Sequence, residues 1–183
     1  CVVTLIFTGF FIGRPPAIHY SHEAYGQYWF GWVRFVHFAF AFVYFFNQLA
    51  RIYWGFVGNQ FARWKNFIPH RARQFREIGE TLRVDILQTQ ARGTISLGHN
   101  ALAGFVYFLS FLVFLFQAFT GFALYSGMSR SLLPRLFTSA VPLMGGDMAV
   151  RQWHHMSMWF FVAFVIVHVY LVAYHDYVEG RGT

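Results

Sequence analysis

Long apolar runs separated by polar connections are the dominant pattern of this chain. No Lys, Arg, Asp or Glu occurs from Gly93 to Ser129, nor from Gln152 to His175. Because about 20 apolar helical residues cross the hydrocarbon of a bilayer, the pattern predicts three complete membrane spans, at about residues 28–56, 101–125 and 153–174. Residues 1–12 are also apolar, but as a helix they reach only about 18 Å. We therefore expect an all-α integral membrane four-helix bundle, whose first helix is truncated at its N-terminal side.

Two other interpretations of the apolar runs have to be weighed. A buried helix pair in a soluble core would also be apolar. However, 57% of the residues are hydrophobic and only 11% are charged, against about 25% charged in soluble domains. Residues 1–12 could be the core of a signal peptide, yet they lack a basic start and an initiating Met. The chain, residues 1–183, is thus expected to form one transmembrane domain without a large extramembrane module.

The polar connections differ strongly in positive charge. The first holds only Arg14, whereas the segment at about 58–99 holds Arg63, Lys65, Arg71, Arg73, Arg76, Arg83 and Arg92. Cytoplasmic connections of membrane proteins carry the excess of Lys and Arg. We therefore expect this basic segment and the C-terminus on the cytoplasmic side of the membrane. The net charge of +7 then reflects topology and contact with membrane lipid, and it indicates no nucleic-acid partner.

Three histidines interrupt otherwise apolar stretches, namely His37, His154 and His168. Ionisable residues within membrane spans are costly and usually functional. With Cys1 as the only cysteine, the chain can hold neither a Cys-ligated iron–sulfur cluster nor a covalently attached haem. Any metal is therefore expected on histidine, and any haem is expected to be bound non-covalently.

Depth along the spans pairs two of these histidines. His154 and His168 are fourteen residues apart, which on a helix means one face and about 21 Å of rise. The spans that carry His37 and His154 run in the same direction, so both imidazoles are expected at similar depth near the outer face. Two opposed neutral imidazoles make a six-coordinate haem iron site. His155 competes with His154, but it is turned about 140° away from the face of His168.

Three arginines stand at positions, relative to the histidines, where they could reach the propionates of a haem. Propionates are carboxylates, which Arg binds in a bidentate manner. Arg34 and Arg151 each precede a proposed iron ligand by three residues. Arg51 follows His37 by fourteen residues and is expected level with His168, where a second haem would lie. The alternative for each is an interfacial arginine that extends its charge to water.

His168 lacks a partner of equal depth in the other spans. Since the first helix runs antiparallel to the last, the matching ligand is expected upstream of Cys1, which leaves the second of two haem sites incomplete in this chain. His99 and Asn100 precede the span at 101–125, where they could hydrogen-bond a quinone. They could equally be the capping residues of that helix.

Short motifs that span nearly the whole chain carry a family resemblance. In order they are Thr8-Gly9-Phe10-Phe11-Ile12-Gly13, Val33-Arg34-Phe35-Val36-His37-Phe38, Arg51-Ile52-Tyr53-Trp54, Gly98-His99-Asn100, Thr120-Gly121-Phe122-Ala123-Leu124-Tyr125, Trp153-His154-His155-Met156-Ser157-Met158-Trp159 and Val167-His168-Val169-Tyr170. Together they resemble the di-haem cytochrome b subunit of membrane-bound, periplasm-facing nickel–iron uptake hydrogenases.

The resemblance implies a redox subunit that is not an enzyme on its own. It would receive electrons from the hydrogenase small subunit, which in turn receives them from the large subunit. It would pass these electrons through haem b to quinone. The complex could form a higher oligomer. It assigns His37 and His154 to the outer haem and His168 to the inner one. The family's first helix begins with an Arg-x-Trp-His-type segment that carries a haem ligand, and this chain lacks that segment. Many relatives have Arg where this chain has His155.

Two alternatives to this function remain from the sequence. One is the cytochrome b gamma subunit of a formate dehydrogenase-like complex, which shares the architecture but serves another catalytic partner. The other is a small transporter subunit without haem, which would use membrane histidines to move protons or ions.

Overall fold

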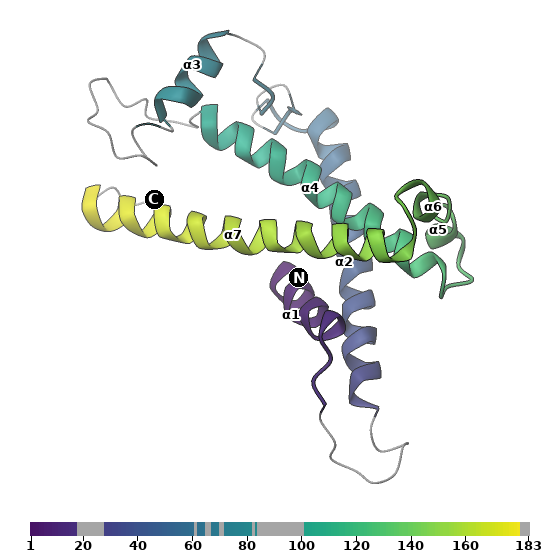
Figure 1. Ribbon diagram of the computed structural model, residues 1–183. Helices are drawn as coiled ribbons and strands as arrows, with labels where there is room; N and C mark the ends of the chain where they lie inside the picture. The colour runs from purple at the N-terminus through teal and green to yellow at the C-terminus, as the bar shows by residue number, and fades with distance from the viewer. Residues whose placement is uncertain are drawn as a thin grey trace. The chain divides into compact units, whose positions relative to one another are not determined.

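The computed structural model describes residues 1–17, 28–60, 62–64, 67–69, 72–81, 83 and 101–179, and every structural statement below refers to these residues. All regular structure in this part of the chain is helical (Figure 1). The helices are α1 (Val2–Gly13), α2 (Trp29–Val57), α3 (Ala72–Thr81), α4 (Ala101–Ser126), α5 (Leu132–Arg135), α6 (Ala140–Leu143) and α7 (Asp147–Glu179).

Three of these helices are long and apolar enough to cross a membrane, with candidate spans at Trp29–Val57, Leu102–Ser126 and Asp147–Ala173. Their outer surfaces are rich in large apolar side chains; Phe35, for example, is 62% exposed and Phe56 is 72% exposed. Such exposure is unusual for a protein surrounded by water, whereas hydrocarbon would cover these side chains. The all-helical structure with three long apolar helices confirms the predicted fold class.

The helix α7 starts six residues before the span that we predicted at 153–174. Asp147 lies in its first turn, where a carboxylate interacts favourably with the helix dipole. The two preceding residues, Gly145 and Gly146, have φ values of 93° and 96°. Side chains disfavour this backbone conformation, so the two glycines separate α7 from the short helix α6.

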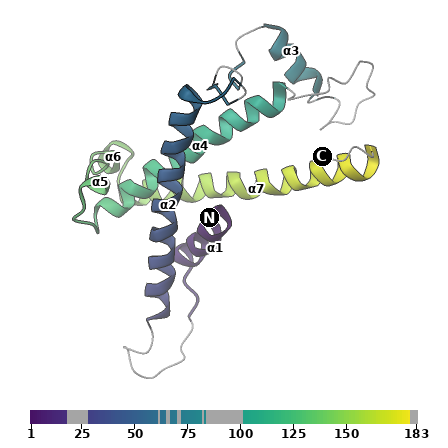
Figure 2. The same ribbon diagram turned by 180° about the vertical axis from the view of Figure 1, so that it is seen from behind.

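The connection between α4 and α7 is folded rather than extended. It forms the one-turn helices α5 and α6, which lie beside the adjoining ends of α4 and α7 in Figures 1 and 2. Ala123 of α4, Ala140 of α6 and Val150 of α7 form a buried cluster there. This packing fixes the start of α7 against the end of α4.

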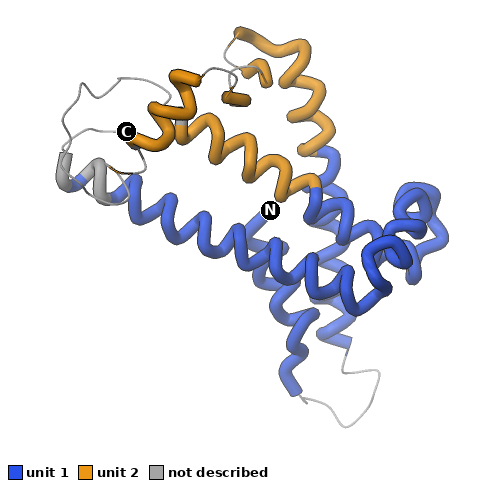
Figure 3. Tube along the Cα trace, turned by 45° about the horizontal axis from the view of Figure 1, so that its top comes forward, with its two compact units in different colours: residues 1–46, 116–183 blue, residues 47–115 orange. Residues whose placement is uncertain are grey.

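The chain divides into two compact units, which Figure 3 shows in different colours. The first contains residues 1–46 and 116–183, and the second contains residues 47–115. In the first unit α1 packs against α7, and the Cys1 thiol contacts the carbonyl oxygen of Phe40 on α2 at 3.4 Å. The second unit contains α3, on whose surface Arg73 forms an ion pair with Glu77.

Candidate functional site

His37 is held between α1 and α2. Its Nδ1 atom lies 2.8 Å from the hydroxyl oxygen of Thr8, and the imidazole is only partly exposed. The backbone of α1 comes close at the next residue, because a Cβ atom built on Gly9 would lie 3.3 Å from Cε1 of His37. The ring is therefore fixed by one hydrogen bond and by close contact with a glycine.

His154 is held in the same way between α4 and α7. Its Nδ1 atom lies 2.8 Å from the hydroxyl oxygen of Thr120, a residue that is fully buried. A Cβ atom built on Gly121 would lie 3.2 Å from Cε1 of His154. On the other side of the ring, the amide nitrogen of Gln117 lies 3.2 Å from Nε2. The hydroxyl of Ser157 contacts the oxygen of the same amide.

These two imidazoles belong to one compact unit. The neighbouring His155 has different surroundings, because its ring lies against Gly13 at the end of α1. No group of three or more His, Cys, Asp or Glu in the described part of the chain could hold a metal ion. A haem iron needs only two axial protein donors, and imidazoles are chemically suited to that role.

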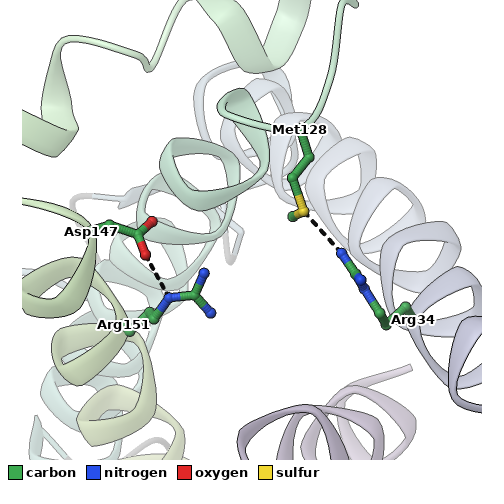
Figure 4. A network of polar contacts seen from close by, with 4 residues as sticks. All are labelled: Arg34, Met128, Asp147 and Arg151. Carbon is green, nitrogen blue, oxygen red and sulfur yellow. Dashed lines mark hydrogen bonds and ion pairs between the residues drawn. The ribbon is translucent and has the colours of Figure 1, made fainter.

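Two of the predicted arginines lie in the same unit as these histidines, and Figure 4 shows their partners. Arg34 points its guanidinium at the sulfur of Met128, with 2.9 Å between the atoms. Arg151 forms an ion pair with Asp147 one turn earlier on α7, at 2.7 Å through its Nε atom. A thioether is a weak acceptor, and the Asp147 pair uses only one edge of the Arg151 guanidinium, so both arginines retain donors for a carboxylate.

The third arginine lies in the second unit, in an aromatic box. The Nε atom of Arg51 donates to the Tyr107 hydroxyl at 2.6 Å, and one terminal nitrogen donates to the Ala62 carbonyl at 3.2 Å. Its guanidinium carbon lies 4.6 Å from the ring centre of Trp64 and 5.4 Å from that of Phe67. Arg51 is half-buried, and cation–π contacts of this kind are favourable, so Arg51 ties the segment after α2 to α4.

The remaining predicted site residues are His168, His99 and Asn100. His168 is exposed on α7 and its ring stacks on Phe164, with 5.7 Å between the ring centres. His168 and Arg51 belong to different units, so their equal depth stays a prediction. His99 and Asn100 lie outside the described residues.

Spacing along the chain assigns no role to Thr8, Thr120 or Gln117, although each contacts a predicted iron ligand. A hydroxyl in a helix can bond to a carbonyl of its own turn, and the partners of hydroxyls and amides on other helices depend on how two helices cross. The one available signal is the tripeptide Thr-Gly-Phe, which occurs at residues 8–10 and again at 120–122.

Comparison with known proteins identifies the family. The sequence profile of the family described as prokaryotic cytochrome b561 matches residues 1–183. A probable Ni/Fe-hydrogenase B-type cytochrome subunit of Cupriavidus necator is 40% identical, over 98% of this chain and 74% of that protein. The protein of the same name from Azotobacter vinelandii is also 40% identical, over 99% of this chain and 76% of its own length. A probable Ni/Fe-hydrogenase 1 B-type cytochrome subunit of Escherichia coli K12 is 35% identical, over 96% of this chain and 76% of its own length.

Matches of this extent agree with the resemblance carried by the motifs, and they favour a redox protein over a transporter without haem. The family consists of membrane helical bundles that bind b-type haem and transfer electrons, and that are not enzymes by themselves. This chain belongs to the prokaryotic cytochrome b561 family.

Proposed function

We propose that this cytochrome takes electrons from a periplasmic Ni/Fe hydrogenase and passes them through b-type haem to the quinone pool. The names of its relatives support the hydrogenase as partner. The observation that carries the haem site is the pair of imidazoles, His37 and His154, each held at Nδ1 by a threonine hydroxyl. In each ring the other nitrogen, Nε2, is then the one suited to bind iron.

The outer haem is the haem that we assign to His37 and His154. When bound, it supplies a one-electron redox centre within the membrane. The two imidazoles would hold its iron, and the Gln117 amide would give up its contact with Nε2 of His154. Arg34 and Arg151 bind the propionates, since each precedes its histidine by one helical turn and keeps free donors.

An inner haem is the second part of the proposal. His168 is its ligand from this chain. Arg51 is the propionate candidate at that depth. Its Nε atom and one terminal nitrogen are already engaged, so it can offer a propionate only its remaining donors.

The direction of electron transfer follows from the expected topology. The basic segment at about 58–99 and the C-terminus are cytoplasmic, because positive charge is retained on that side. The hydrogenase small subunit then docks on the outer side near the outer haem, with the large subunit beyond it. Quinone binds towards the inner side, with His99 and Asn100 as candidates for its hydrogen bonds. The assembled complex could form a higher oligomer.

The decisive experiment uses membranes that contain the complete complex. Addition of H2 under anaerobic conditions should give the reduced absorbance bands of a b-type haem, and addition of a quinone should reoxidise it. Formate in place of H2 serves as the control substrate. Reduction by formate and none by H2 would contradict the hydrogenase assignment and support the formate dehydrogenase-like alternative.

A further inference from the structure

Two segments of the chain repeat the same sequence elements in the same order. Thr-Gly-Phe at residues 8–10 is followed by Val-Arg-x-x-His at residues 33–37. Thr-Gly-Phe at residues 120–122 is followed by Val-Arg-x-x-His at residues 150–154. In the first copy the Thr-Gly-Phe lies on α1 and the histidine lies on α2. In the second copy the Thr-Gly-Phe lies on α4 and the histidine lies on α7.

The contacts of the threonine and of the glycine with the histidine also match between the two copies. Each histidine Nδ1 lies 2.8 Å from the threonine hydroxyl of its own copy. The glycine that follows each threonine lies close to the same ring. A Cβ atom added to Gly9 would lie 3.3 Å from Cε1 of His37, and one added to Gly121 would lie 3.2 Å from Cε1 of His154. Equal sequence and equal geometry indicate two equivalent half-sites, one for each imidazole.

The proton positions in both half-sites follow from the hydroxyl groups. A hydroxyl has one hydrogen to donate, and a threonine within a helix commonly gives it to the carbonyl four residues earlier. Thr8 does so to Thr4 at 2.7 Å, and Thr120 does so to Phe116 at 2.9 Å. Each hydroxyl therefore accepts from the imidazole, so the ring hydrogen resides on Nδ1 and the lone pair on Nε2.

The same tautomer is compatible with the surroundings of His154. The amide nitrogen of Gln117 lies 3.2 Å from Nε2 of His154. An amide nitrogen can only donate, and an Nε2 atom without a hydrogen can accept. The nitrogen with the lone pair is the one that can bind a metal.

We propose that Thr8 and Thr120 are paired positioning residues, which fix the tautomer and orientation of His37 and His154 as axial ligands of one haem. This inference rests on the proposed haem site and extends it to two residues that do not touch the iron. Hydrogen-bond acceptors behind a ligating imidazole raise its basicity, and a more basic ligand favours ferric iron. The two hydroxyls therefore lower the reduction potential of the outer haem, and they do so to similar extents.

The test measures the midpoint potential and the retention of the outer haem in the purified complex. Thr8→Val and Thr120→Val keep the volume but remove the acceptor, while Thr8→Ala and Thr120→Ala remove both. All four variants should shift the potential upwards, by similar amounts for the two sites, and the double Val variant should show the sum. Haem retention should fall about 10–100-fold, as for other residues that orient a metal ligand.

Matched variants separate this role from packing. Thr8→Ser and Thr120→Ser keep the hydroxyl and should restore the wild-type potential. Thr138→Val is the control, because the Thr138 hydroxyl bonds only to a backbone carbonyl of its own turn, at 2.9 Å. If a Val variant fails to assemble, the Ala and Ser variants at the same position give the same comparison.

An unchanged potential in the Val and Ala variants would overturn the inference, and so would Ser variants that behave like Ala. Failure of the haem assignment itself looks different, because His37→Ala and His154→Ala would then keep the outer haem. If the histidine variants lose the haem while the threonine variants leave its potential unchanged, only the positioning role is refuted.

Discussion

Gly9 and Gly121 bring the backbones of α1 and α4 against the two imidazoles. A methyl group at either position would lie 3.3 or 3.2 Å from Cε1 of the histidine, closer than carbon atoms normally pack. The ring would have to shift by a few tenths of an ångström. We therefore expect Gly9→Ala and Gly121→Ala to weaken haem retention, measured as haem per protein after purification.

Gly127→Ala is the control for these variants, because the nearest atom to its built Cβ is a backbone oxygen at 4.0 Å. It should leave the haem content unchanged. Equal haem content in all three variants would contradict the close packing of backbone and imidazole.

Arg34 provides a test of the charge near the outer haem. A cation beside the propionates stabilises the reduced, more negative haem by Coulomb attraction. Arg34→Gln should therefore lower the midpoint potential, the opposite direction to Thr8→Val, and Arg34→Lys should lower it less. The exposed Arg130 is the matched control, and an equal shift in Arg130→Gln would show that the effect is not local.

At the scale of residues, the sequence predicts the ligand candidates but not what holds them. His37 and His154 stand out because ionisable groups are rare within apolar spans. Their partners Thr8 and Thr120 do not stand out, since a hydroxyl can bond to a carbonyl of its own helix on any face. Gln117 is a polar side chain within an apolar span, but the group it contacts depends on how α4 and α7 cross. The aromatic box around Arg51 was also not predicted, because it depends on how the segment after α2 folds back.

At the scale of elements, the turn before α7 determines where the helix with His154 begins. Gly146 has a φ of 96°, and a Cβ atom built on it would meet nothing within 4 Å. The cost of Gly146→Ala is therefore purely conformational, about 1–2 kcal/mol. We expect a lower thermal midpoint for haem loss in detergent, followed by absorbance, while Gly127→Ala should leave the midpoint unchanged.

The long helices could be predicted because apolar length alone indicates them. The structure has Trp29–Val57 and Ala101–Ser126, within a residue or so of the ranges expected from the sequence. The short helices α5 and α6 were not predicted. Both are single turns, and Ala140 of α6 packs against Ala123 and Val150. Such contacts leave no periodic pattern in so few residues.

At the scale of the whole molecule, the expected sidedness can be measured directly. Cys1 is the only cysteine, so Cys1→Ser gives a background without thiols. Gly79→Cys places a thiol on α3, where its Cβ meets nothing within 4 Å. Ser131→Cys places one before α5, where the serine side chain makes no capping hydrogen bond.

A thiol reagent that does not cross membranes should label the Ser131→Cys variant in spheroplasts. The Gly79→Cys variant should be labelled only after the membrane is permeabilised, because the basic segment is expected in the cytoplasm. The reverse pattern of labelling would invert the topology, and with it the side on which the hydrogenase docks.

The central claim is one complete haem site on His37 and His154, and haem content in three histidine variants tests it most directly. Optical and EPR spectra of purified complexes should show that His37→Ala and His154→Ala each lose the outer haem. The His155→Ala variant should retain it, because the ring of His155 lies against Gly13 rather than beside Thr120. Loss of the haem in His155→Ala together with its retention in His154→Ala would contradict the assignment.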